Sequence, residues 1–214
     1  MLNNKDLKAV LDILENHYRD TTTTLEFSTP FQLLISTMLA AQSTDVRVNI
    51  VTGTLFELHG TPDLILQLTV AELQEKIKTV GLYKSKAKNI LATCRILVDR
   101  YQGKVPLTRE ELMQLPGVGR KTANVVLSIA SDFDAIAVDT HVFRVSNRIG
   151  LADARDVLRT ENQLMQNIPR KKWSAAHHWL IWHGRKICKA RNPLCTKCPL
   201  TTYCIFYHRN IEGR

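Results

Sequence analysis

Lys121 is the first residue whose type and position suggest chemistry. It lies in the segment LPGVGRKTANVV (residues 115–126), where Gly117 and Gly119 precede an apolar stretch with helical spacing. A turn that leads into a helix N-terminus presents unpaired backbone N–H groups and the positive end of the helix dipole, which suits a phosphate. A lysine in the first turn opposes that dipole, because cations are favoured at helix C-termini. Lys121 is therefore either a further phosphate contact or an amine that takes part in a reaction.

Asp139 is the second candidate, because it is a carboxylate within the apolar segment IAVDTHVFRV. Such a residue is buried and paired, caps a helix that begins near Thr140, or is catalytic. We interpret His141 as a structural histidine. A lysine amine and a carboxylate beside phosphate-binding amides suit one reaction, in which the amine attacks a sugar C1′ to form a Schiff base. The carboxylate would stabilise the cationic sugar and move the proton, so that an N-glycosidic bond is cleaved and the 3′ phosphate is eliminated.

Two further residues, on separate predicted loops, suit the same chemistry. Gln42 follows a very apolar helical segment in LAAQSTD, and Leu82 lies in VGLYKSKAKN among three nearby lysines, Lys84, Lys86 and Lys88. Enzymes that act on a base within a duplex extrude the nucleotide, and inserted side chains fill the gap. Considered alone, Gln42 would be interpreted as a helix C-cap and Leu82 as an exposed loop residue.

Four of the five cysteines lie close together near the C-terminus. They are Cys188, Cys195, Cys198 and Cys204, with the spacing C-x6-C-x2-C-x5-C. Thiols this close, in a chain without an apparent export signal, are typical of metal ligands rather than disulfides. Zinc and iron–sulfur clusters both accept four cysteines, and generic spacing does not decide between them. We expect a structural role, in which the bound metal presents Lys189, Arg191 and Lys197 as a rigid cationic surface. We interpret Cys94 as a buried structural thiol.

The charge distribution indicates a polyanionic partner. The chain of 214 residues has a formal net charge of +9, and residues 170–214 contain ten Lys or Arg against one acidic residue, so residues 1–169 are neutral overall. We interpret the excess as a sign of nucleic-acid binding. The alternatives are a basic soluble surface or a counter-charge for an anionic group held by that segment. Because no apolar run is long enough to span a bilayer and the N-terminus is polar, we predict a cytoplasmic protein, associated with the nucleoid if the source is prokaryotic.

Helix signals dominate the segments that must position these residues. Thr29, Thr69 and Thr108 are each followed three residues later by Gln or Glu, which predicts helix N-termini. Between Ser85 and Gln102 apolar residues recur at helical spacing, and DAIAVDTHVF is the one strand-like segment. Glycines stand where helix C-caps are expected, at Gly60, Gly81 and Gly103. We therefore predict an all-α protein with a modest break near residues 131–135.

Together these segments resemble the endonuclease III family of DNA glycosylases, within the helix-hairpin-helix superfamily, from about residue 20 to residue 205. LPGVGRKTANVV is similar to the family's hairpin with its catalytic lysine, and AVDTH is similar to the segment with its catalytic aspartate. The four-cysteine segment resembles its 4Fe–4S loop, and this resemblance, rather than the spacing, indicates iron–sulfur instead of zinc. AAQSTD and GLYKSKA resemble its two DNA-inserting loops.

The resemblance implies an all-α helix-hairpin-helix DNA glycosylase fold, with two helical domains and the DNA groove between them. Residues 22–133 would form the central domain, and residues 1–21 with 134–214 would form the second domain with the cluster loop. Lys121 would be the nucleophile and Asp139 would activate it, while Gln42 and Leu82 would fill the gap left by the flipped nucleotide. The hairpin residues that would hold a DNA phosphate are Gly117, Val118, Gly119 and Arg120.

The function implied is base excision repair by a monomer that binds double-stranded DNA with a damaged base or an abasic site. The enzyme would be a DNA glycosylase with AP lyase activity on oxidised pyrimidines. One alternative is a monofunctional mismatch glycosylase of the same superfamily, although the adenine-mismatch branch lacks the hairpin lysine. Another is a non-catalytic DNA-binding iron–sulfur protein, which leaves Lys121 and Asp139 unexplained. Ala40 and Met113 stand where some members have polar pocket residues, so the lesion preference is left open.

Overall fold

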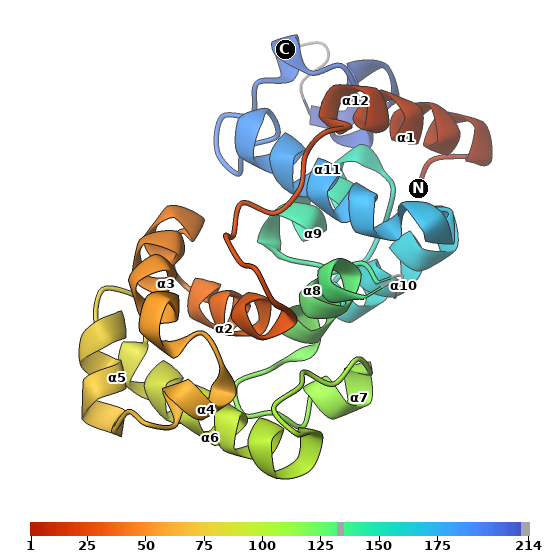
Figure 1. Cartoon of the computed structure of the whole chain (residues 1–214). Helices are drawn as coiled ribbons and strands as arrows, with labels where there is room; N and C mark the ends of the chain where they lie inside the picture. Colours follow the sequence, from red (N-terminus) through yellow and green to blue (C-terminus); the bar gives the residue numbers. More distant parts are fainter. Residues whose placement is uncertain (132–134, 211–214) are drawn as a thin grey trace. The chain divides into compact units, whose positions relative to one another are not determined.

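Helices make up all the regular structure in the computed structural model, which describes residues 1–131 and 135–210 (Figure 1). In chain order the α-helices are α1 (Asn4–Tyr18), α2 (Pro30–Ala40), α3 (Asp45–His59), α4 (Pro62–Ile65), α5 (Val70–Ile77), α6 (Tyr83–Tyr101), α7 (Arg109–Leu112), α8 (Arg120–Ala130), α9 (Thr140–Ile149), α10 (Val157–Asn167), α11 (Trp173–Lys186) and α12 (Ile205–Asn210), and the short 3-10 helices are η1 (Arg170–Lys172), η2 (Cys195–Lys197) and η3 (Thr201–Tyr203). The predicted all-α fold is confirmed. Across the described ranges, none of these helices combines the length and the apolar character needed to cross a membrane.

The segment DAIAVDTHVF, the one strand-like stretch of the sequence, forms no strand in its described residues. In its described part, residues 135–139 form an extended stretch without regular structure, and α9 begins at Thr140. A β-strand needs a neighbouring strand to receive its backbone hydrogen bonds, whereas this stretch leads into a helix and is followed by helices. Its four consecutive apolar residues, 135–138, are buried instead, and Ile136 and Val138 pack in the core of the terminal unit.

The chain divides into two compact units. The central unit comprises Thr24–Phe133, and the terminal unit combines Met1–Thr23 with Asp134–Arg214. The boundaries expected from the sequence stood after residues 21 and 133. The break expected near residues 131–135 falls largely on residues 132–134, which lie outside the described residues.

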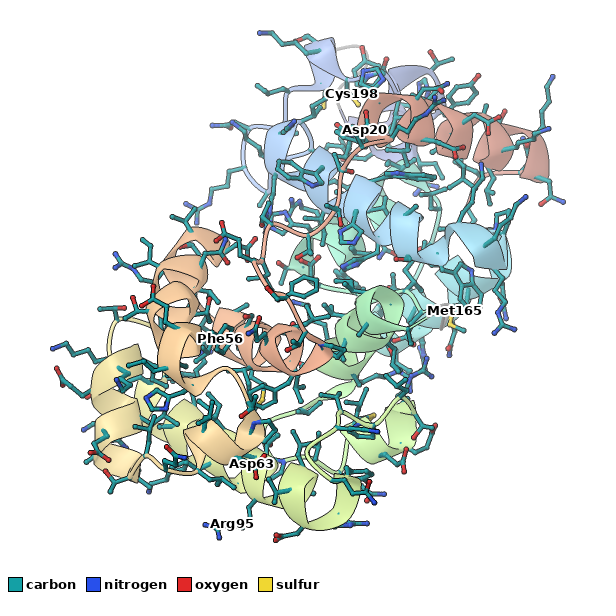
Figure 2. All side chains as sticks on the ribbon, viewed as in Figure 1. Asp20, Phe56, Asp63, Arg95, Met165 and Cys198 are labelled. Atoms are coloured by element: carbon teal, nitrogen blue, oxygen red, sulfur yellow. The ribbon has the colours of Figure 1, made fainter. Side chains whose placement is uncertain are left out.

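Helix α2 lies at the centre of the central unit. Its sequence PFQLLISTMLA is apolar on nearly every side, and Leu33, Leu34, Ile35 and Leu39 are fully buried. A helix with this composition is stable only when other elements surround it, and α2 packs against α3, α6 and α8. Figure 2 shows the side chains between these helices. The end of α2 is thereby held in place by three neighbours.

The three predicted helix starts are confirmed. Thr29, Thr69 and Thr108 are the N-caps of α2, α5 and α7, and each side-chain oxygen accepts a hydrogen bond from the backbone amide three residues later. Thr69 and Glu72 form the complete reciprocal capping box. These caps satisfy amides that have no partner within the helix.

Gly81 was expected to end a helix, but it has another role. Helix α5 ends at Ile77, and Gly81 directly precedes Leu82, the N-cap of α6. A Cβ atom at Gly81 would lie 2.7 Å from the carbonyl oxygen of Gln42. Glycine is therefore required because two loops approach each other here.

Helices α9 and α11 form the centre of the terminal unit. Helix α11 packs against α9 and α1, and α9 also packs against α10 and α12. The core between them includes Val142, Val145 and Ile149 of α9 together with Trp179 and Leu180 of α11. Because α9 is fixed along one side by these contacts, the residue at its N-terminal end, Asp139, is fixed as well.

Leu55 and Leu58 lie on the same helix, α3, but their side chains are 1% and 68% exposed. Leu55→Ala should lower the free energy of unfolding by about 2–5 kcal/mol, because it removes buried methyl groups and leaves a cavity. Leu58→Ala is the matched control and should change that free energy by no more than about 0.5 kcal/mol. Urea unfolding followed by circular dichroism measures both, and equal effects would contradict this assignment of the buried face.

Candidate functional site

The glycine hairpin before α8 is a tight turn held by α6. The backbone amide of Val118 donates to the carbonyl oxygen of Leu115 at 3.0 Å, and Gly117 has a φ of 78°. A Cβ atom at Gly117 would lie 2.8 Å from the Nδ2 atom of Asn89 on α6. Glycine is therefore needed here both for its backbone conformation and for space. The hydroxyl of Thr93, also on α6, donates to the carbonyl oxygen of Pro116 at 3.0 Å.

Lys121 lies in the first turn of α8, and its side chain is exposed. The opposite side of α8 is buried, and Asn124 on that side accepts a hydrogen bond from Nε of Arg109 on α7 at 2.8 Å. The preceding Gly119 is the N-cap and has no side chain to satisfy the first amides of the helix. The lysine amine therefore stands on a rigid helix start, where it is accessible to a ligand.

The hairpin residues expected to hold a phosphate differ in whether their backbone amides are available to it. The amide of Val118 already closes the turn, and its side chain is only 5% exposed. The amides of Gly119 and Arg120 follow at the start of α8, where the helix dipole favours an anion. The hairpin is suited to a phosphate mainly through the amides that follow Val118.

Asp139 is the N-cap of α9. Its Oδ1 atom accepts a hydrogen bond from the amide of Val142 at 2.7 Å, and its side chain is half-buried. The stretch before it is fixed by His177 on α11, whose Nδ1 donates to the carbonyl oxygen of Ala137 at 2.7 Å. The capping role is thereby confirmed. A carboxylate has two oxygens and several acceptor positions, so capping through Oδ1 is compatible with a catalytic role, which stays a prediction.

His141 has a defined structural partner. The guanidinium group of Arg144 can only donate, so its NH2 atom donates to Nδ1 of His141, at 3.2 Å. Arg144 also donates to the carbonyl oxygens of Gly184 and Cys188, each at 3.0 Å. Burial lowers the pKa of His141, which favours the neutral ring at neutral pH. These contacts agree with the structural role predicted for this histidine.

Gln42 and Leu82 lie on two loops that contact each other in the central unit. The amide of Gly81 donates to the hydroxyl of Ser43 at 2.9 Å, across 38 residues of sequence. Gln42 and Leu82 both have left-handed backbone conformations, with φ of 56° and 59°, and both are exposed. Such conformations are uncommon for residues other than glycine and need support from their surroundings. The Gln42 and Leu82 loops, which are distant in sequence, therefore lie side by side and both expose their central residue.

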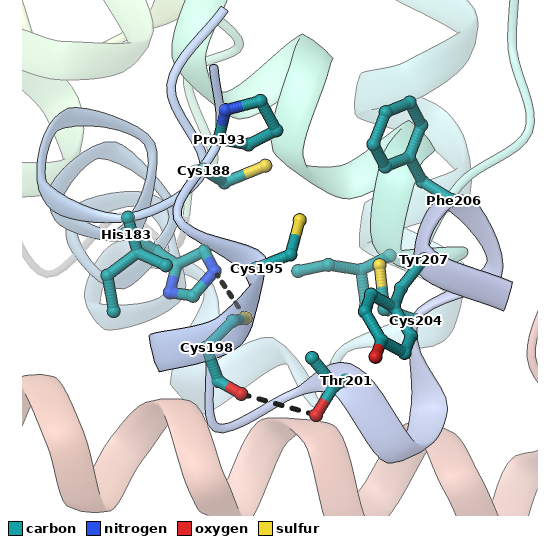
Figure 3. A pocket seen from close by; sticks show the side chains of 11 residues that line it. His183, Cys188, Pro193, Cys195, Cys198, Thr201, Cys204, Phe206 and Tyr207 are labelled. Atoms are coloured by element: carbon teal, nitrogen blue, oxygen red, sulfur yellow. Dashed lines mark hydrogen bonds between the residues drawn. The ribbon is translucent and has the colours of Figure 1, made fainter. Parts of the chain in front are cut away.

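The four C-terminal cysteines line one small cavity (Figure 3). Apolar side chains complete its wall, among them Ile149, Ile187 and Phe206. Within the described ranges, no three His, Cys, Asp or Glu side chains gather around a point that would hold a single metal ion. The thiols are instead distributed around the cavity, as ligands to a polynuclear group would be.

Hydrogen-bond donors face two of these sulfur atoms. His183 Nε2 lies 3.6 Å from the sulfur of Cys198 (Figure 3). NH1 of Arg148 lies 3.6 Å from the sulfur of Cys188. Burial lowers the pKa of His183 to about 4, so its ring is neutral and carries one proton. A metal-bound cysteine is a thiolate that accepts hydrogen bonds. With Cys198 in that form, the ring proton would lie on Nε2, and Nδ1, 3.1 Å from the hydroxyl of Tyr18, would accept from it. Four thiolates with N–H donors around them fit an iron–sulfur cluster.

Arg148 also fixes the basic loop between the first two of these cysteines. Its NH1 donates to the carbonyl oxygen of Lys189 at 2.7 Å, and its NH2 donates to that of Ala190 at 3.0 Å. The guanidinium group lies 4.5 Å from the ring centre of Phe206. The side chains of Lys189 and Arg191 are exposed. The two predicted DNA contacts are therefore exposed to solvent on a loop whose backbone is bound by Arg148.

The basic excess of residues 170–214 is partly balanced inside the terminal unit. Lys172 Nζ lies 2.7 Å from a carboxylate oxygen of Glu15 and 3.8 Å from one of Asp12, both on α1. The hydrogen bond from Lys172 holds the pKa of Glu15 below its usual value. Lys172 is thus engaged by α1, so this base is less available to a polyanion than an unpaired one, although the formal charge of the chain is unchanged.

Sequence reasoning missed three polar residues that support the site: the buried Lys86 and His183, and the half-buried Arg148. The helical spacing contained a signal for Lys86, because this residue stands four residues before the apolar Ile90 and so lies on the same side of the helix. In the structure Ile90 is buried and Lys86 is 6% exposed. Arg148 and His183 gave no such signal, since their partners are distant in sequence. Cys94 is fully buried, as predicted, and burial raises the pKa of its thiol to about 12.

Comparison with known proteins identifies two segments. Residues 35–170 match the HhH-GPD superfamily of base excision DNA repair proteins. Residues 188–204 match the iron-sulfur binding domain of endonuclease III. The second match begins and ends at cysteines that line the cavity, which supports the fit of that site to an iron–sulfur group.

Full-length relatives agree with these matches. Endonuclease III of Rickettsia conorii is 48% identical over 94% of this chain and 96% of its own length. Endonuclease III of Escherichia coli strain K12 is 48% identical over 94% of this chain and 94% of its own. A solved structure of a trapped covalent intermediate between endonuclease III and DNA has a TM-score of 0.93 and 46% identity, and covers 98% of this chain and 99% of that one.

The family resemblance inferred from the hairpin, the aspartate and the cysteine spacing is confirmed by these matches, which extend over nearly the whole chain. The helical fold is shared with the solved structure, and the cysteine-lined cavity coincides with the iron-sulfur match. This chain belongs to the endonuclease III family of base excision DNA repair enzymes and carries a 4Fe–4S cluster.

Proposed function

We propose that this chain is a DNA glycosylase with AP lyase activity, which removes oxidised pyrimidines from double-stranded DNA through a Schiff base formed by Lys121. The observation that carries the proposal is the exposed amine of Lys121 on the first turn of α8, directly after the glycine hairpin. Support comes from the relative trapped as a covalent intermediate with DNA, because such an intermediate requires a nucleophile on the protein. The enzyme acts in the cytoplasm as a monomer.

The proposed reaction begins with attack of the unprotonated Lys121 Nζ on C1′ of the damaged nucleotide. The N-glycosidic bond breaks, and the base leaves with its electron pair and is protonated. Ring opening gives a Schiff base between Nζ and C1′. Removal of a proton from C2′ then breaks the bond between C3′ and its oxygen, which releases the 3′ phosphate, and water hydrolyses the Schiff base to regenerate the amine.

Asp139 has the electrostatic role in this proposal. Cleavage of the glycosidic bond places positive charge on the sugar, and a fixed carboxylate lowers the free energy of that cation. Asp139 also accepts and returns the proton of the attacking amine. Lys121 belongs to the central unit and Asp139 to the terminal unit, and the proposal requires the damaged nucleotide to reach both.

The DNA contacts follow from the chemistry of the exposed groups. The amides at the start of α8, with Gly117, Gly119 and Arg120, suit a backbone phosphate, and Lys189 and Arg191 add two charges on a fixed loop. Leu82, which is 55% exposed, and Gln42 fill the gap left by the extruded nucleotide. An apolar side chain gains free energy by leaving water for the base stack.

The four cysteines that line the cavity, Cys188, Cys195, Cys198 and Cys204, are the proposed ligands of the 4Fe–4S cluster. When bound, the cluster supplies iron–thiolate bonds that cross-link the loop. This segment has few large buried side chains of its own apart from Leu200, so such bonds replace a hydrophobic core. Lys189 and Arg191 are carried by the loop that these bonds close.

Lys121→Ala should abolish strand cleavage and borohydride trapping on a duplex with one oxidised pyrimidine, because the nucleophile is removed. Lys121→Arg is the discriminating variant, since a guanidinium group keeps the charge but does not form a Schiff base. It should fail equally. If Lys121→Arg were active, the residue would be a phosphate contact, and trapping by the alanine variant would also refute its role as the nucleophile.

Asp139→Asn should lower the single-turnover rate of base release by at least about a hundredfold, because the charge that stabilises the cationic sugar is lost. Asparagine is as good an N-cap as aspartate, so the thermal midpoint should hardly change. Asp139→Ala should lose the same activity and also about 1 kcal/mol of stability from the missing cap. Near-normal turnover of the asparagine variant would reduce Asp139 to a helix cap.

His183→Leu should release iron to a chelator faster than the wild-type protein does, because the N–H group that faces Cys198 is lost. Tyr18→Phe keeps the imidazole but removes the hydroxyl that orients it, so an intermediate rate is expected. Bleaching of the visible absorbance of the cluster measures all three. Identical bleaching rates would show that this contact does not support the cluster.

A further inference from the structure

Lys86 is a buried charged residue to which the reaction proposed above gives no role. It lies in the first turns of α6 and is 6% exposed, whereas Lys84 and Lys88 on the same helix are exposed. Its Nζ donates to the carbonyl oxygen of Leu39 at 2.7 Å and to that of Ala41 at 2.5 Å. Burial lowers the pKa of this amine. Both oxygens belong to neutral carbonyl groups, so this ammonium is bound by the backbone of another helix.

The two carbonyls lie at the C-terminal end of α2. The last carbonyls of a helix lack partners within it and form the negative end of the helix dipole, so an ammonium group is a suitable cap. Gln42 follows Ala41 directly. The backbone amide of Lys86 meanwhile donates to the carbonyl oxygen of Leu82 at 3.0 Å. That backbone bond is the ordinary first-turn hydrogen bond of α6, so Lys86 stands one helical turn after Leu82 while its side chain binds the base of the Gln42 loop.

Two other contacts join the same loops. The amide of Gly81 donates to the hydroxyl of Ser43 at 2.9 Å. Gly81 also lies so close to the carbonyl oxygen of Gln42 that a Cβ atom would clash with it. Gln42 and Leu82 are both held in left-handed conformations, which persist only when the surroundings enforce them. The geometry of each loop therefore depends on the other.

We propose that Lys86 is a positioning residue that holds the Gln42 and Leu82 loops in one fixed arrangement, so that both side chains enter the base stack together. This inference rests on the function proposed above for Gln42 and Leu82. Unstacking a nucleotide is unfavourable, and side chains that are already placed compensate for that cost better than side chains that must be ordered on binding. The ammonium group is buried because it must reach two carbonyls of α2, whereas a lysine that contacts DNA would be exposed.

Lys86→Met tests this role, because methionine keeps an unbranched apolar chain and removes the ammonium group. Two duplexes are compared at single turnover, one with an oxidised pyrimidine and one with a pre-formed abasic site, where no base has to be unstacked. The rate on the lesion should fall about ten- to a hundredfold, as expected for misplaced groups. Cleavage at the abasic site should stay within about threefold of wild type, because Lys121 is untouched.

Matched variants separate position from charge. Lys84→Met and Lys88→Met remove exposed charges from the same helix, and they should affect both duplexes equally through weaker DNA binding. Gln42→Ala sets the size of the defect that follows from one lost side chain in the stack. A 2-aminopurine opposite the lesion reports the rearranged stack on binding, and the fluorescence change seen with the wild-type enzyme should be lost in Lys86→Met.

Circular dichroism and the thermal midpoint show whether Lys86→Met is folded. If it is not, Ser43→Ala removes the other polar link between the loops and should show the same selective defect with a smaller magnitude. Wild-type rates on both duplexes, or an equal loss on both, would overturn the positioning role. A selective defect in Gln42→Ala without one in Lys86→Met would overturn this inference alone. A wild-type enzyme inactive on both duplexes would overturn the proposed function itself, and this inference with it.

Discussion

The burial of α2 is the constraint on which the central unit depends. A helix whose sequence is PFQLLISTMLA cannot expose any side to water without a large loss of hydrophobic free energy, so other helices must cover it. The helices that do so include α8, whose first turn carries Lys121, and α6, which begins after Leu82. Gln42 follows the end of α2 itself. One apolar helix therefore determines the relative positions of the residues of this unit that are proposed to act on DNA.

Buried and half-buried polar groups then select one arrangement among those that hydrophobic burial would allow. Lys86 binds two carbonyls of α2, Arg148 binds two carbonyls of the basic loop, and His183 lies between Tyr18 and Cys198. Removing a charge or a ring N–H from water is unfavourable unless its hydrogen bonds are replaced. Any packing in which the partners of these side chains move away is therefore higher in free energy.

At position 139 the structural role and the proposed chemical role both favour an aspartate. A carboxylate at a helix N-cap interacts well with the dipole and with the second or third amide of the helix. The hydrogen bond between Oδ1 and Val142 fixes the side chain on α9, which is itself packed against α11. A catalytic carboxylate needs that rigidity, because charge stabilisation falls quickly when the group is misplaced.

The sequence by itself determined the helical fold, the helix starts at Thr29, Thr69 and Thr108, and the family, because these depend on periodicity, capping chemistry and motif spacing. It also indicated the cysteine cluster. It did not determine that residues 135–139 form an extended stretch without regular structure, because a strand-like composition does not reveal whether a neighbouring strand exists. Only the tertiary structure decided that Gly81 contacts Gln42, that Lys86 is buried against α2, and that Lys172 pairs with α1. The reason is physical: these contacts join residues far apart in sequence, and their free energies depend on which groups lose water together when the helices pack.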